Sequence, residues 1–244
     1  MKDLNLEIIY QDKNLVAVNK PNGLLVHRSA IAADVSQFAV QILRDQIGQH
    51  VFPIHRLDRK TSGILLFALD KESTKLVQKE FLENRIYKKY IAIVRGFFPE
   101  KIEVDHPLVN DRNKKQDAVT NFINNKHTEI KIPYGKYSTS RYSLIEAFPR
   151  TGRQHQIRKH LNHLRHPIIG DRPYGCNKQN KLFKERWNMM TMLLHAQEMS
   201  FKHPNEDKVV ILKASLNKEF PVLLMVSEHH NTCNIMEILS KTNL

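Results

Sequence analysis

An aspartate surrounded by basic residues is the strongest candidate for chemistry in this chain. Asp58 lies between Arg56 and Arg59, in the segment His55-Arg56-Leu57-Asp58-Arg59-Lys60-Thr61-Ser62-Gly63. Neighbouring cations favour the ionised form of a carboxylate, and no second acid stands beside it. An ionised carboxylate that is held still is suited to act as a nucleophile. A solvated turn would show the same spacing, so the segment's composition alone leaves both interpretations open.

The elements around Asp58 are predicted to hold it in place. The apolar run at 64–69 predicts a buried strand directly after the basic segment. Asp70 is placed to cap a helix that runs to about Asn84. Two short apolar runs within residues 6–19 predict a hairpin, and Lys20-Pro21-Asn22-Gly23 predicts a turn after it. Asp58 is therefore expected at the start of a buried strand.

The remaining pattern predicts an α+β fold in a single catalytic domain that spans 1–244, with its core at about 6–215. The sheet is expected to be mixed and mostly antiparallel, with flanking helices and loops, because predicted strands outnumber helices. Residues 111–136 are expected to form a surface insertion or mobile loop, and about 220–244 a tail. Further elements are predicted as a helix ending at Gly48, strands at 90–94, 141–148, 192–195 and 209–213, and a helix at 154–165.

Composition narrows the class of partner. The chain has 244 residues, with 38 Lys and Arg against 25 Asp and Glu, and a net charge of +13. This excess favours a polyanion such as nucleic acid. Cys176 and Cys233 are far apart in sequence, which argues against a thiolate zinc site or a disulfide framework. No signal sequence or membrane span is apparent, so a cytoplasmic protein is expected.

Two other segments carry candidate functional residues. Tyr90 lies on a predicted buried strand, where a tyrosine is either core packing or a ring that stacks on a base. The run Thr151-Gly152-Arg153-Gln154-His155-Gln156-Ile157-Arg158 opens a basic helix, an arrangement suited to phosphate. Histidines 160, 163 and 166 follow at a spacing of three, but no carboxylate accompanies them, so no metal is expected. No nucleotide-cofactor fingerprint is present, and no cofactor is expected.

The motif His-Arg-Leu-Asp-x-x-Thr-Ser-Gly resembles the signature of the RluA-type pseudouridine synthases. The segment from Lys20 to His27 resembles the first motif of that family, and Tyr-x-Ala-x-Val-x-Gly from Tyr90 resembles the second. The run from Thr151 to His160 resembles the third. These blocks occur in family order. An accessory domain that precedes the core in some members, of the S4 type, is expected to be missing here.

The resemblance implies a role for each matching residue. Asp58 is implied to be the nucleophile, Arg158 to pair with it, and Tyr90 to hold the base in the active site. Arg56 is implied to fill the space that a flipped base leaves. The residues expected to contact the substrate RNA are His55, Arg56, Arg59, Thr61, Lys20, Arg153 and His155.

The substrate is the least determined part of this interpretation. Segments at 26–29, 46–52 and 138–142 resemble family members that act on uridine 65 of tRNA, which implies tRNA as the partner and no protein partner. A monomer is expected. Two alternatives stay open at this point: a ribosomal RNA synthase of the same family, and a non-catalytic RNA-binding relative.

Overall fold

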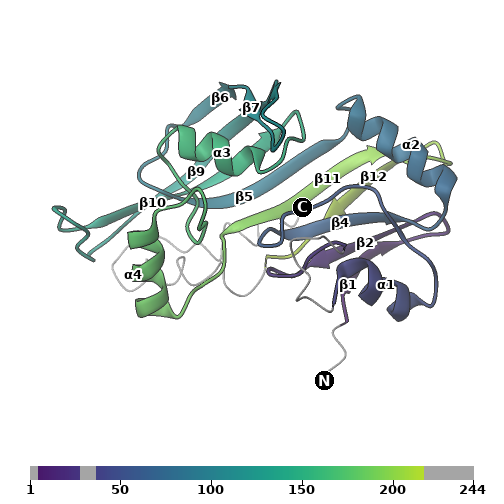
Figure 1. Ribbon diagram of the computed structural model, residues 1–244, viewed down its shortest axis with the longest axis horizontal. Helices are drawn as coiled ribbons and strands as arrows, with labels where there is room; N and C mark the ends of the chain where they lie inside the picture. Colours follow the sequence, from purple (N-terminus) through teal and green to yellow (C-terminus); the bar gives the residue numbers. More distant parts are fainter. Residues whose placement is uncertain (1–4, 28–36, 217–244) are drawn as a thin grey trace.

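The computed structural model describes residues 5–27 and 37–216, and it shows one sheet that runs the length of the molecule (Figure 1). The elements are β1 (Glu7–Gln11), β2 (Leu15–Lys20), α1 (Ala39–Ile47), β3 (Phe52–Pro53), β4 (Ser62–Ala68), α2 (Lys71–Leu82), β5 (Tyr87–Arg95), β6 (Lys101–Asp105), β7 (Leu108–Val109), β8 (Lys115–Gln116), β9 (Val119–Ile130), β10 (Ser140–Pro149), α3 (Gln156–His163), α4 (Asn177–Trp187), β11 (Leu194–Lys202) and β12 (Val209–Lys213). The predicted tail at 220–244, and Arg28 and Ser29 of a resembling segment, lie outside the described residues.

The sheet consists of two halves, one with β1, β2 and β4 and one with β5, β10, β9 and β6, and β11 joins them. Its order is β1-β2-β4-β11-β5-β10-β9-β6, with β12 paired to β11 and β3 paired to β4. Strand β11 therefore lies between β4 and β5 in the sheet (Figure 1). In the sequence, only α2 separates β4 from β5. Among the described strands, only β4 and β11 pair in parallel. The prediction of a mixed, mostly antiparallel α+β fold is confirmed.

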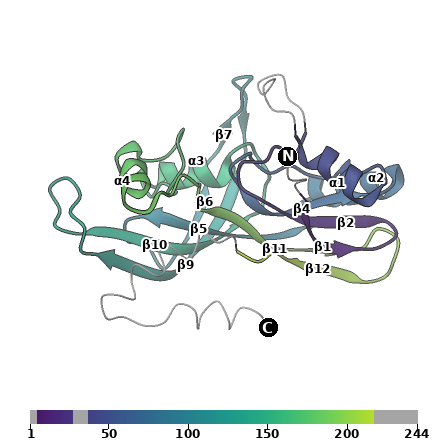
Figure 2. The same ribbon diagram turned by 90° about the horizontal axis from the view of Figure 1, so that it is seen from below.

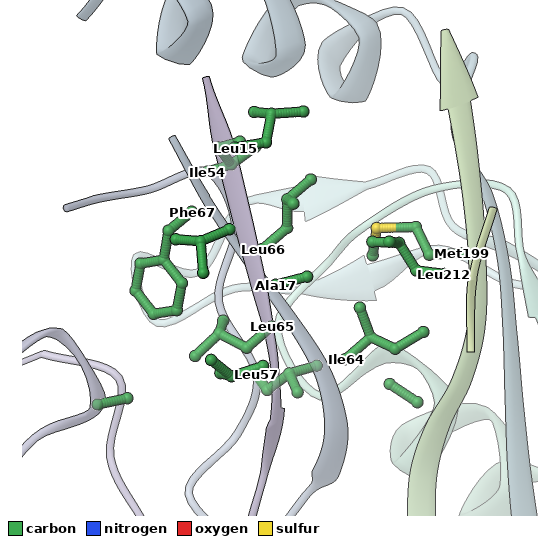
Figure 3. Packing of buried hydrophobic residues seen from close by; sticks show 14 of the residues in the cluster. Leu15, Ala17, Ile54, Leu57, Ile64, Leu65, Leu66, Phe67, Met199 and Leu212 are labelled. Carbon is green, nitrogen blue, oxygen red and sulfur yellow. The ribbon is translucent and has the colours of Figure 1, made fainter. Parts of the chain in front are cut away.

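The first half of the sheet contains the largest apolar cluster. Every residue of β4 is buried, as the apolar run predicted. Leu57 is only 6% exposed and packs beside Leu65, in the middle of this strand (Figure 3). Burying a leucine side chain is worth roughly 2 kcal/mol. This burial fixes the backbone on the N-terminal side of Asp58.

Helices α1 and α2 lie over this half of the sheet, on the upper side of the strands in Figure 2. Residues close in sequence set where these helices begin or end. Gly48 ends α1 in the left-handed conformation at φ 65°, as predicted. The carboxylate of Asp70 accepts a hydrogen bond from the Ser73 amide at 2.7 Å and so caps α2. The predicted hairpin is β1 and β2, paired antiparallel.

The expectation of a surface insertion or mobile loop at 111–136 is wrong for residues 119–130. Residues 119–130 form β9, which pairs with β10 on one side and β6 on the other. Only three residues of β9 are buried, Thr120, Phe122 and Ile130, and its Asn and Lys residues are half-buried or exposed. The polar composition therefore reflects a strand with one wet face and not a loop. Helix α4 was not predicted, because its Lys- and Asn-rich sequence gives a weak apolar stripe.

Candidate active site

A cleft of about 310 Å³ opens where the two halves of the sheet meet. Its lining comes from the loop before β4, the end of α2, strand β5, the start of α3 and Leu194 of β11. The lining includes eight of the ten residues predicted from the sequence: His55, Arg56, Asp58, Thr61, Tyr90, Arg153, His155 and Arg158. Arg59 and Lys20 are not part of it. Asp58 is the single carboxylate among the described residues that line this cleft.

The backbone on both sides of Asp58 is anchored. Leu57 is buried in the core, and the Thr61 amide donates to the Asp58 carbonyl oxygen at 3.0 Å. Gly63 has φ 104°, and a Cβ at this position would lie 2.2 Å from the Ala196 carbonyl oxygen. Only glycine permits that approach of β4 to β11. The Thr-Ser-Gly part of the motif therefore fixes the strand that carries the loop.

Lys20 lies outside the lining of the cleft. It is fully buried, and its ammonium donates to the carbonyl oxygens of Pro21 (2.9 Å), Leu24 (2.9 Å) and Arg59 (3.2 Å). Burial lowers the pKa of Lys20 to about 7, against a smaller opposing effect of the Asp58 charge. Two of these acceptors belong to the turn at 21–24 and one to the loop after Asp58, so the ammonium of Lys20 ties that loop to the turn. A contact between Lys20 and RNA stays a prediction.

Arg158 joins two carboxylates. Its Nη1 donates to Asp58 Oδ2 at 2.7 Å, while Nε and Nη2 donate to the two oxygens of Asp171 at 2.7 and 2.9 Å. Arg158 is 7% exposed and Asp171 is 1% exposed. Burial alone would lower the pKa of the Arg158 guanidinium, but the hydrogen bonds to Asp171 and Asp58 raise it above its ordinary value. The bidentate bond to Asp171 fixes the plane of the guanidinium that Asp58 meets.

Tyr90 contributes a phenol to the same cleft. Burial raises its pKa above the ordinary value, and the charge of Asp58 raises it further. The phenol is therefore neutral at physiological pH. This state suits stacking and hydrogen-bond donation better than acceptance of a proton.

The two histidines of the cleft have different surroundings. His155 Nε2 lies 3.7 Å from Asp58 Oδ1, and its Nδ1 is 3.0 Å from the Tyr174 hydroxyl. His155 precedes α3 in a left-handed conformation, at φ 56°. His55 stacks on Phe81, and its Nε2 accepts a hydrogen bond from the Leu66 amide at 3.1 Å. Burial lowers the pKa of His55 to about 4, so this ring is neutral at pH 7.

The predicted arginines lie at the rim. Arg56 and Arg153 are exposed and line the cleft. Arg153 Nε donates to the Asp117 carbonyl oxygen at 2.9 Å. Arg59 is also exposed, but its Nε donates to the Gly23 carbonyl oxygen at 3.0 Å, outside the cleft. Arg56 and Arg153 are therefore placed to meet an anion that enters from solvent.

Three contributors were missed from the sequence: Asp171, Lys88 and Phe81. Asp171 follows Ile168-Ile169-Gly170 and is buried there, and an acid directly after an apolar run was a usable signal. The histidines of α3 serve the fold: His160 Nε2 bonds the His106 carbonyl oxygen, and His163 stacks on His106. Among residues 5–27 and 37–216, no group of three or more His, Cys, Asp or Glu is placed to hold a metal. No helix in these ranges is long and apolar enough to cross a membrane.

Known proteins resemble this chain over most of its length. The family model described as RNA pseudouridylate synthase matches residues 14–163. The chain is 44% identical to a tRNA pseudouridine synthase C of Vibrio vulnificus, over 92% of this chain and 100% of that protein. It is 46% identical to a protein of the same name from Vibrio cholerae, over 90% of this chain and 94% of that one.

Solved structures resemble the fold. Human RNA Pseudouridylate Synthase Domain Containing 1 superposes with a TM-score of 0.73, covering 99% of this chain and 96% of that chain at 22% identity. Human RNA Pseudouridylate Synthase Domain Containing 4 superposes with a TM-score of 0.65 at 27% identity, covering 93% and 95%. The family resemblance of the motifs is confirmed, and the chain belongs to the RNA pseudouridylate synthase family.

Proposed function

We propose that this protein isomerises uridine to pseudouridine in tRNA, at position 65, with Asp58 as the nucleophile. The observation that carries the proposal is the 2.7 Å bond from Arg158 to Asp58 in a cleft with no other carboxylate among its described lining residues. A cavity of about 310 Å³ lies at the small end of ligand pockets. It suits one nucleoside taken out of a helix better than a stacked pair.

The reaction breaks the N1–C1′ bond, turns the base and joins C5 to C1′. Oxidation state does not change, so the chemistry needs neither a redox cofactor nor an energy source. A uridine that is stacked in RNA must first be extruded, at a cost of a few kcal/mol. Exposed Arg56 at the rim is suited to occupy the space that the base leaves.

Asp58 is the proposed reacting group on each of three routes. Its carboxylate attacks C1′, or assists formation of a glycal, or adds to C6 of the base. Arg158 holds the carboxylate in place, and Asp171 in turn holds Arg158. Tyr90 is proposed to hold the base through its ring.

The choice of tRNA rests on the relatives and on charge. The similar Vibrio proteins are named tRNA pseudouridine synthase C, and the net charge of +13 suits a folded RNA. We propose that the protein acts as a monomer in the cytoplasm, without a protein partner. Light scattering of the protein with and without tRNA measures the stoichiometry.

The test uses unmodified tRNA transcripts that carry uridine at position 65. Pseudouridine is mapped by carbodiimide-blocked primer extension for the wild type, Asp58→Asn and a control variant, Asp207→Asn, whose side chain is 96% exposed. A stop at position 65 is expected for the wild type and the control. Asp58→Asn is expected to form no product while its affinity for tRNA stays within about threefold, because Asp171 still holds Arg158.

Three outcomes contradict parts of the proposal. Substantial product from Asp58→Asn would remove Asp58 as the nucleophile. Product on ribosomal RNA but not on tRNA would keep the reaction and discard the substrate. If the wild type forms no pseudouridine on either RNA, the protein is an RNA-binding relative without this activity.

A further inference from the structure

Lys88 is the one lysine among the described residues that line the cleft. It lies two residues before Tyr90 on β5, and side chains two apart on a strand face the same side of the sheet. Its side chain is largely buried, with the residue 9% exposed, and the ammonium lies 5.9 Å from the centre of the Phe81 ring. The lysine therefore reaches the cleft with a buried stem.

No described residue offers the Lys88 ammonium a carboxylate or a hydrogen-bond acceptor within contact distance. The adjacent Lys89 differs, since its ammonium lies 3.2 Å from Glu198 and 3.7 Å from Glu146. Burial lowers the pKa of Lys88, whereas the hydrogen bond to Glu198 and the nearby acids outweigh burial and raise that of Lys89. Burying most of a lysine side chain without an ion-pair partner costs stability. The presence of Lys88 in a cleft is explained if a ligand supplies the acceptor.

Ring contacts show which end of the cleft Lys88 occupies. Its ammonium lies 5.9 Å from the centre of the Phe81 ring, and Phe81 stacks on His55 with 5.1 Å between the ring centres. Lys88 therefore lies at the His55–Phe81 end of the cleft, on the same face of β5 as Tyr90. A uracil whose ring lies along Tyr90 extends toward this end, and its carbonyl edge is the part that an ammonium binds.

We propose that Lys88 is a further catalytic residue, whose ammonium binds a carbonyl oxygen of the flipped uracil and stabilises the negative charge that the base acquires. This inference rests on the proposed function. When the N1–C1′ bond breaks, its electron pair stays with the base, which becomes an anion delocalised over N1, C5 and both carbonyl oxygens. The sugar carbon is held by the Asp58 carboxylate. When C5 bonds to C1′, the carboxylate leaves, C5 loses its proton and N1 gains one.

The symmetry of uracil makes one fixed cation sufficient. A half-turn about the axis through N3 and C6 exchanges N1 with C5 and the C2 carbonyl with the C4 carbonyl. An oxygen therefore faces Lys88 both before and after the base turns. Addition of Asp58 to C6 also places charge on the C4 oxygen, so Lys88 acts on that route as well. Cytosine offers an amino group at C4, which an ammonium does not bind, so the same contact favours uridine.

The test compares Lys88→Met with Lys89→Met, two neighbouring substitutions that remove one charge from each side of β5. Single-turnover rates and tRNA affinities are measured for both. Lys88→Met is expected to slow product formation by about 10²-fold, as for the loss of one donor to a developing oxyanion, with affinity changed less than about threefold. Lys88→Arg is expected to recover part of the rate. Lys89→Met is expected to keep the wild-type rate.

A second measurement separates contact with the base from a structural effect. Target tRNAs carry 2-thiouridine or 4-thiouridine in place of uridine, since sulfur is the weaker hydrogen-bond acceptor. At least one thio substrate is expected to slow the wild type more than it slows Lys88→Met, which has lost the contact. Thermal unfolding of Lys88→Met is expected at or above the wild-type temperature, because an unpaired buried charge is gone.

The outcomes separate this inference from the function beneath it. A wild type that forms no pseudouridine on any RNA overturns the proposed function. An active wild type with an equally active Lys88→Met overturns the role of Lys88. A slow Lys88→Met with the wild-type ratio of thio to oxygen substrates also overturns it, because the loss is then structural. If Lys88→Met does not fold, the ratio of the rates on thio and oxygen substrates is measured for Lys88→Arg instead. A ratio equal to that of the wild type then overturns the role of Lys88.

Discussion

The two sides of β5 place neighbouring residues in opposite surroundings. On the cleft side, Lys88 and Tyr90 face a cavity, and burial lowers the pKa of one and raises that of the other. On the far side, Lys89 is held between Glu146 and Glu198, and these partners raise its pKa. The sequence Lys88-Lys89 gives no sign of this difference. It arises because successive residues of a strand alternate between faces.

The contrast shows that the two faces of one strand can serve different purposes, one stabilising the fold and the other facing a ligand. The far side satisfies its charges within the protein, so its ion pairs contribute to folding. The cleft side leaves groups buried without protein partners, which costs stability and keeps them available to a ligand. Substitutions on the cleft side are therefore expected to change the rate more than the fold, and those on the far side the reverse.

The largest loss of rate is expected from substitution of Arg158, which forms ion pairs with Asp58 and Asp171. Arg158→Lys removes the planar fork that bonds Asp58 and Asp171 together. The single-turnover rate is expected to fall by about 10²-fold or more, and the free energy of unfolding by roughly 3 kcal/mol, since buried Asp171 and half-buried Asp58 lose their shared guanidinium. Kinetics and urea unfolding measure both. Arg85→Lys, on an exposed arginine, is the control. A wild-type rate in Arg158→Lys would show that Asp58 needs no positioning by a fork.

The next effect compares the two tyrosines of β5. Tyr90→Leu removes the ring in the cleft, and Tyr87→Leu removes one that is 43% exposed on the other side. Tyr90→Leu is expected to lose about 10²-fold in rate, and Tyr87→Leu less than about twofold, if alternation governs function. Tyr90→Phe separates the ring from the hydroxyl. Equal losses from both leucine variants would break the comparison between the two sides.

A smaller effect concerns burial and pH. His195 is fully buried beside Ser62 at 2.9 Å, and burial lowers its pKa to about 4 from an ordinary 6.5. The unfolded chain therefore takes up the proton first as pH falls. The contribution of the neutral ring is present above pH 6.5 and is lost as pH drops toward 4, by about 3 kcal/mol in full. Urea unfolding between pH 4 and 8 is expected to show this loss, and His195→Gln to show less of it. An unchanged slope in His195→Gln, matching that of exposed His50→Gln, would contradict this origin.

Much of the fold followed from local signals. The β1–β2 hairpin, the buried run of β4, the Asp70 cap of α2 and the end of α1 at Gly48 all depend on residues close in sequence. Strand β9 was missed because its partners, β6 and β10, bury only part of it. Its polar residues therefore resemble a loop until the pairing is known.

The site was predictable where a motif carried it and not where contacts are long-range. The Arg158–Asp58 bond was expected from the family resemblance alone, since 100 residues separate the two. Lys20 was assigned to RNA because a lysine can contact phosphate, whereas the three carbonyl oxygens around it belong to a turn and a distant loop. Lys88 was not singled out because its neighbour has the same charge. For both lysines, the sequence did not show which atoms surround the side chain in the folded protein.

The position of β11 in the sheet has a consequence for how the molecule is made. Strands β4 and β5 precede β11 by about a hundred residues or more, yet β11 lies between them, and Ser62 meets His195 across a separation of 133 residues. Closing so long a loop is slow, because its entropy is lost before the contacts form. During synthesis, the β11-facing edges of β5 and of the Ser62–Gly63 part of β4 stay unpaired until the ribosome has passed residue 202, while β3 already pairs with Phe67 and Ala68. The catalytic cleft is thus completed late in the folding of a newly made chain.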